Sequence, residues 1–134
     1  MRTIPTLDNS DAIVLRDAAL TAAREAGIAV AVAVVDSAGT LLDFHRHQGT
    51  RSHMVDFAIR KARTAAQLGL PTKMLEAMAA QGRPMSPETL AMAGGVPVIV
   101  DGLSAGAVGV SGGSSEADHN IAGAAVAALD SGDG

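Results

Sequence analysis

Three histidines lie close together around one short segment of the sequence. His45 and His47 alternate with Asp43, and His53 follows within a few residues. If this segment is a strand, Asp43, His45 and His47 share one face, with neighbouring side chains about 7 Å apart. Such a group could converge on a zinc or iron ion, with His45, His47 and His53 as the ligands. The same pattern of residues is equally typical of a polar strand that faces solvent.

A fourth histidine, His119, follows Asp118 at the start of a predicted C-terminal helix. A helix N-terminus disfavours positive charge, so this imidazole is expected to be neutral and available as a base or ligand. His47, His53 and His119 are therefore candidate catalytic residues. They would support acid–base or metal-assisted chemistry of the isomerase, lyase or hydrolase type on a small oxygenated molecule. The alternative for His119 is a surface side chain without a role.

A glycine-rich corner precedes the same helix and is a candidate binding site. Its residues are Ser111, Gly112, Gly113 and Ser114, with Glu116 just beyond. Glycine has no Cβ, so backbone N–H groups at such a corner can approach a ligand and hold a carboxylate. The corner lacks the Gly-Lys-Ser/Thr ending of a P-loop and the setting of a dinucleotide fingerprint. Ser111 has no nucleophile elbow around it.

The elements that position these residues follow from hydrophobic periodicity and turn signals. Strands are expected in adjacent pairs, which favours an antiparallel sheet with helices packed on it, the α+β class. The strand over 28–35 is apolar on both faces and is expected to be central. Ser10 is expected to cap the first helix, and Ser115 and Asp118 to form a capping pair on the last. The predicted order is a helix over 10–26, strands over 28–35 and 40–47, a helix over 52–68, a short helix over 72–80, an irregular segment over 81–93, strands over 96–100 and 105–110 around an Asp101-Gly102 turn, and a final helix over 115–129.

Composition limits the classes of protein that this chain can represent. The 134 residues fit one domain, expected over 10–130 after a lead-in at 1–9 and before a tail at 131–134. Apolar residues make up 48% but aromatic residues only 1%, so we expect another copy of the chain to cover part of the apolar surface. A net charge of −4 with scattered basic residues argues against a nucleic-acid partner. No apolar run is long enough for a membrane span, so a cytoplasmic location is expected.

Several motifs occur in an order that resembles the GlcG/HbpS family, which includes the C-terminal domain of PduO-type proteins. They are Asp36-Ser37-Ala38-Gly39, Arg46 with Gly49, Lys61-Ala62-Arg63-Thr64-Ala65-Ala66, Gly95-Val96-Pro97, and Gly109-Val110-Ser111-Gly112-Gly113 with Asp118. The resemblance implies a profilin-like domain with about five antiparallel strands, assembled into dimers and often octamers. It also implies an association with haem or corrinoids, in some members with haem degradation or redox sensing.

The resemblance adds residues to the candidate cofactor site. Arg46, Lys61 and Gly95 fall in family motifs and join His45 and the glycine corner. Where relatives read Arg-Met-Asp-Gly-Ala, this chain has Arg46-His47-Gln48-Gly49-Thr50. Any of the four histidines could ligate haem through a neutral imidazole. Two hypotheses stay open: a protein that binds haem or a related cofactor between the glycine corner and the histidine strand, and an enzyme that uses the histidines.

Overall fold

The computed structural model describes residues 1–130, which form four helices and one four-stranded antiparallel sheet in the order β2-β1-β4-β3. The predicted α+β class is confirmed. The fifth strand implied by the family resemblance is absent from residues 1–130; the longest irregular segment, 81–94, contains Pro84 and Pro87, which cannot donate to a sheet. The elements are α1 Asn9–Ala26, β1 Ala31–Asp36, β2 Leu41–Arg46, α2 His53–Leu68, α3 Thr72–Ala80, β3 Gly95–Val100, β4 Leu103–Ser111 and α4 Ser115–Asp130.

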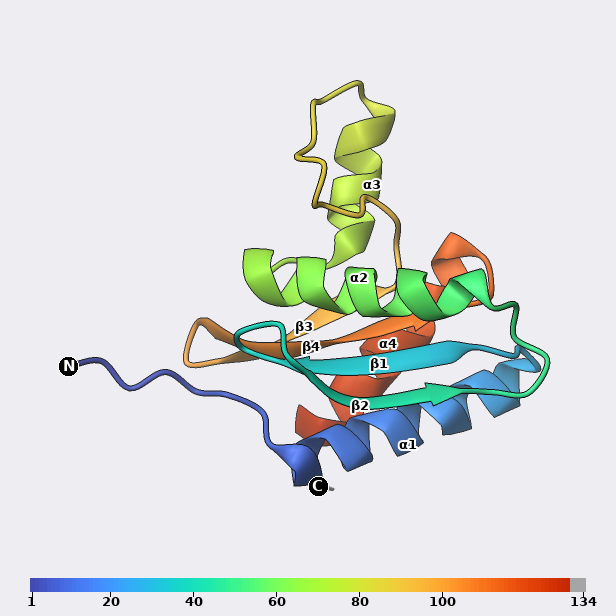
Figure 1. The fold of residues 1–134 in the computed structure, drawn as a ribbon, viewed down its shortest axis with the longest axis horizontal. Helices are drawn as coiled ribbons and strands as arrows, with labels where there is room; N and C mark the ends of the chain where they lie inside the picture. Colours follow the sequence, from blue (N-terminus) through green and yellow to red (C-terminus); the bar gives the residue numbers. More distant parts are fainter. Residues whose placement is uncertain (131–134) are drawn as a thin grey trace.

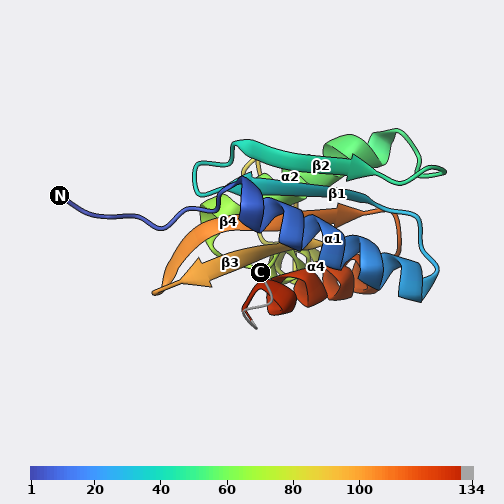
Figure 2. The ribbon, with the colours of Figure 1, turned by 90° about the horizontal axis from the view of Figure 1, so that it is seen from below.

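The sheet lies between two helical layers. Helix α2 covers one face, and α1 and α4 lie side by side on the other (Figures 1 and 2). Strand β1 is buried on both faces, as its sequence predicts. Val32 and Val34 pack with α1 and α4, whereas the alanines and Val35 pack with α2. Because alanine is small, α2 can approach the sheet closely.

Strand β2 pairs with β1 so that Asp43 faces the same side as His45, as the period of two predicts. Asp43 is opposite Val34, and His45 is opposite Val32. The register shifts at Val34 and Val35, and beyond this bulge Leu42 packs with the α1 and α4 cluster. Leu42 therefore shares a face with Asp43, although a strict period of two would place neighbouring residues on opposite faces.

Two predicted helix caps are also wrong. Asp8, not Ser10, caps α1. Its carboxylate accepts the backbone N–H of Asp11 at 3.0 Å, and the carboxylate of Asp11 accepts the backbone N–H of Asp8. At α4, the hydroxyl of Ser114 accepts the N–H of Ala117 at 3.1 Å. The sequence alone does not decide which residue caps each helix, because neighbouring polar residues can take the same N-cap position.

Helix α3 and the segment 81–94 project from the α2 side of the molecule, and the lead-in extends sideways from the start of α1 (Figure 1). The predicted turn between β3 and β4 is confirmed, with positive φ angles of 52° at Asp101 and 78° at Gly102. Within residues 1–130, no helix is both long and apolar enough to cross a membrane. The predicted tail, 131–134, lies outside the described residues.

Candidate functional site

Two cavities meet at the bend between α1 and β1, at Gly27 and Ile28. We call them the histidine cavity and the arginine cavity. The histidine cavity has a volume of about 380 Å³, within the range of pockets that take small molecules. It is lined by Leu20, Ala23, Arg24, Gly27, Ile28, Val30, His45 and His47.

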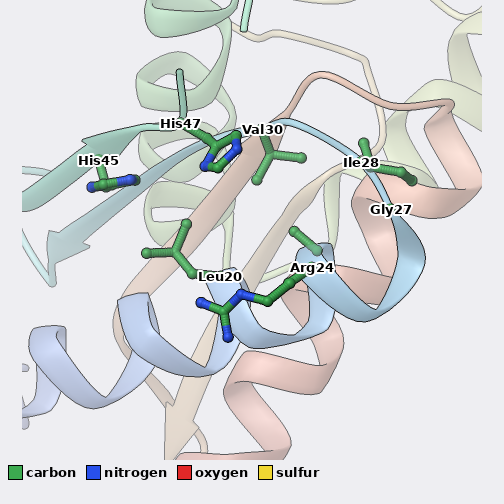
Figure 3. Close-up of a pocket in the computed structure, with 8 residues that line it drawn as sticks. Leu20, Arg24, Gly27, Ile28, Val30, His45 and His47 are labelled. Atoms are coloured by element: carbon green, nitrogen blue, oxygen red, sulfur yellow. The ribbon is translucent and has the colours of Figure 1, made fainter. Parts of the chain in front are cut away.

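The histidine cavity forms where α1 ends beside β2. Gly27 ends α1 in the left-handed conformation, with φ 71°, and the chain turns into β1. The backbone N–H of His47 donates to the carbonyl of Val30 at 3.0 Å, which continues the pairing beyond the end of β2. His45 and His47 thereby lie along one edge of the cavity, and Leu20 and Arg24 lie along the facing edge (Figure 3).

The ionisable residues that line the histidine cavity are all basic. They are Arg24, His45 and His47, and no Asp or Glu of the described chain lines this cavity. Leu20, Ile28 and Val30 supply an apolar wall. This combination suits a ligand with an apolar body and an acidic group.

The arginine cavity lies on the other side of the bend and has a volume of about 510 Å³. It brings the glycine corner, through Gly112, next to the segment that follows the histidine strand. Arg51 is its single ionisable lining residue among those described. It is lined by Gly27, Ile28, Ala29, Gly49, Thr50, Arg51, Met54 and Gly112.

The remainder of the glycine corner holds a carboxylate of its own chain. The N–H of Gly113 donates to Oδ1 of Asp118 at 2.8 Å. Lys61 Nζ donates to Oδ2 of Asp118 at 3.3 Å and to the carbonyl of Val110 at 3.0 Å. Burial lowers the pKa of Lys61 and raises the pKa of Asp118, and the attraction between them opposes both shifts.

These contacts correct the prediction of Lys61 as a cofactor contact. Its side chain is 2% exposed, lines neither cavity and already has a carboxylate partner. Asp118 likewise cannot cap α4 as predicted, because its carboxylate is turned toward Lys61 and the corner.

Other predicted cofactor residues are occupied by packing. The Ser111 hydroxyl donates to the sulfur of Met54 at 3.0 Å, and the N–H of Gly95 donates to Oγ1 of Thr72 at 2.8 Å. A Cβ on Gly95 would lie 2.4 Å from the carbonyl oxygen of Lys61, so this glycine permits close packing. Ser114 caps α4, as described above. Arg46 and Glu116 are exposed and line neither cavity.

The structure brings His45 and His47 to one cavity but leaves His53 and His119 outside it. His53 packs edge-on against Phe57, with ring centres 5.6 Å apart, and lines neither cavity. His119 lies on α4, where burial, with a smaller contribution from the charge of Lys73, lowers its pKa. Among residues 1–130, no three His, Asp or Glu side chains could hold a metal ion.

The predicted zinc or iron site at His45, His47 and His53 is therefore not formed within the described chain. Nor is a catalytic group of His47, His53 and His119. Sequence reasoning missed Arg24, Thr50 and Arg51. The signal that could have found the last two is their position next to the unusual His47-Gln48-Gly49 segment.

A four-stranded antiparallel sheet between one helix and a helix pair, with two basic cavities at one end, defines a small α+β domain with room for a small molecule. The chain belongs to the HbpS-like family, described as haem degrading protein HbpS-like, whose model matches residues 7–127. The resemblance seen in the sequence motifs is thereby confirmed.

Curated and solved relatives agree with this membership. The chain is similar to protein GlcG of Escherichia coli strain K12, 41% identical over 85 residues, which cover 61% of this chain and 63% of GlcG. The match thus spans less than two thirds of that relative's length. A double mutant of Streptomyces reticuli HbpS is similar with a TM-score of 0.88 and 36% identity, over 96% of this chain and 90% of the other. The PduOC:heme complex is similar with a TM-score of 0.84 and 29% identity, over 92% and 94%.

Proposed function

We propose that this protein binds haem or a related cofactor in the histidine cavity, with His45 or His47 as the ligand to the metal. The observation that carries the proposal is that two imidazoles, an apolar wall and Arg24 line one cavity. An imidazole nitrogen is a common axial ligand of haem iron, and an arginine can pair with a propionate. The family description and the similarity to the PduOC:heme complex support haem as the ligand class.

The types of residue that line the histidine cavity suit haem. Leu20, Ile28 and Val30 offer contact to an apolar ring, and no buried carboxylate of the described chain stands in the cavity to repel the acidic groups. Bound haem would supply one-electron or oxygen chemistry. The residues of this chain would hold and orient it and limit the access of water.

A haemin titration followed in the visible spectrum tests this proposal. We expect a saturating Soret shift at one haemin per chain, which the double variant His45→Ala, His47→Ala abolishes. The matched control is His53→Ala, which removes an imidazole that lines neither cavity and should leave the titration unchanged. The proposal is wrong if the natural sequence gives no shift, or if the double variant binds as the natural sequence does.

The second candidate is an enzyme that acts on a small acidic substrate in the same cavity. The observation that favours it is the pair of imidazoles beside Arg24, since Arg24 could hold a carboxylate while a histidine moves a proton. This candidate predicts turnover of a small hydroxy or keto acid that depends on His47, without a Soret shift by haemin.

We also propose that copies of the chain associate. Large apolar side chains stay exposed near the start of α3, where Leu68, Leu70 and Met74 are 48%, 38% and 49% exposed. An exposed apolar surface of this kind is typical of a protein contact.

A further inference from the structure

The arginine cavity has no role in the function proposed above, yet its chemistry is specific. The whole chain carries a net charge of −4, but the ionisable residues that line the two cavities are Arg24, His45, His47 and Arg51, with no acidic residue among the described lining. In an acidic protein, this local excess of basic groups selects anions. Neither Arg24 nor Arg51 has an ion-pair partner within residues 1–130.

Thr50 gives an independent indication of a polar ligand. Thr50 lines the arginine cavity and is only 7% exposed, and its hydroxyl has no hydrogen-bond partner in the described chain. Buried hydroxyls are normally paired, because an unpaired one costs stability. A ligand oxygen beside Arg51 would supply the missing partner.

The local backbone joins this group to the histidine cavity. The N–H of Thr50 donates to the carbonyl of His47 at 3.0 Å, so one tight turn presents the histidine at one end and the threonine at the other. Gly27 and Ile28 line both cavities, so a ligand that lies across this bend contacts both.

We propose that Arg51 and Thr50 form a carboxylate-binding subsite, which receives an acidic arm of the ligand whose apolar body occupies the histidine cavity. The inference rests on the proposed function and names the part of the ligand that the arginine cavity recognises. The same chemistry would be presented by a haem propionate or by a free carboxylic acid, and the experiment below separates them.

The test compares haemin with its dimethyl ester, in which both carboxylates are blocked. Arg51→Ala should weaken haemin binding by about tenfold, the effect of one lost charge-assisted hydrogen bond, and should leave binding of the ester unchanged. Arg60→Ala is the matched control, because it removes the same charge from a residue of α2 that lines neither cavity. Equal effects of the two variants on haemin, or an equal effect of Arg51→Ala on haemin and on the ester, would overturn the subsite.

Thr50→Val separates a binding role from a structural one. It keeps the shape and removes the unpaired hydroxyl, so the melting temperature without ligand should rise by about 3 °C while the affinity for haemin falls. A structural role would instead lower the melting temperature. An unchanged affinity would exclude Thr50 from the subsite.

An NMR titration with acetate at constant ionic strength keeps the subsite testable if haemin does not bind. Saturable shifts of the amide signals of Thr50, Arg51 and Gly112, lost in Arg51→Ala, would support a free acid as the ligand while the haem proposal fails. If haemin does not bind and acetate gives no such shifts, the subsite is wrong as well.

Discussion

Lys61 shows what a single buried charge does in this molecule. Its ammonium joins α2 to the end of β4 and to the first turn of α4, through Val110 and Asp118. Removing two charges from water is costly, and their attraction offsets the cost only while both partners are present. The pair therefore fixes the glycine corner, and with it the position of Gly112 at the arginine cavity.

Replacing Lys61 by Met should lower the free energy of unfolding by about 3–5 kcal/mol, because the buried carboxylate of Asp118 loses its cation. Adding Asp118→Asn should recover part of this loss, since an amide oxygen can still accept the N–H of Gly113. Urea unfolding measures both changes, with the exposed Lys73→Met as the control, expected within about 0.5 kcal/mol. A loss below about 1 kcal/mol for Lys61→Met would contradict this account of the pair.

His119 should make stability depend on pH. Its pKa is lowered in the folded protein by burial and by Lys73. Between the lowered pKa and the usual value near 6.5, the unfolded chain binds more protons than the folded chain, so stability falls as the pH drops through this range. We expect the melting temperature to fall more between pH 8 and pH 5.5 for the natural sequence than for His119→Gln; parallel curves would refute the assignment.

Glycine in β4 decides how closely α2 packs on the sheet. A Cβ on Gly109 would lie 2.0 Å from the carbonyl oxygen of Ala58 in α2, so backbone would have to move. Gly123 in α4 differs, because a Cβ there would meet nothing within 4 Å. A side chain would therefore clash at Gly109 in β4 but would fit at Gly123 in α4.

The same substitution at these two sites should change stability in opposite directions. Gly109→Ala should destabilise the protein by about 3 kcal/mol through overpacking, whereas Gly123→Ala should stabilise it by about 0.5–1 kcal/mol because alanine favours a helix. Denaturant unfolding would measure both changes. Stabilisation by Gly109→Ala would show that α2 does not lie as close to β4 as described.

At the scale of the whole molecule, α3 and the segment 81–94 project away from the sheet and its helices (Figure 1). Leu68, Leu70 and Met74 remain exposed near the base of this projection. With aromatic residues at 1% of the chain, the core depends on small side chains, and burial of this surface by a second copy would add to it.

We therefore expect sedimentation equilibrium to give a mass of at least two chains. Leu70→Asp together with Met74→Asp should shift the protein toward the monomer, because charges in an apolar contact must be desolvated. Ile13→Asp is the control, since Ile13 is similarly exposed, at 45%, but lies on α1. A monomeric natural protein would disprove self-association, and an equal effect of both changes would place the contact elsewhere.

The sequence by itself determined the elements and the class of fold. The two apolar faces of β1 and the Asp101-Gly102 turn are local patterns, and local patterns select secondary structure. The order of motifs was also sufficient for the family. Caps were less certain, because Asp8 and Ser10 are both good acceptors for the same helix end.

Only the tertiary structure decided which residues share a site. Lys61 and Asp118 are 57 positions apart, and their contact fills the glycine corner that the sequence alone suggested for a ligand. Arg24 meets His45 and His47 because α1 ends beside β2, and Arg51 meets Gly112 because β4 ends beside the start of α2. Local periodicity fixes which face of an element a side chain occupies, but the residues opposite it depend on how distant elements pack, which no local pattern encodes.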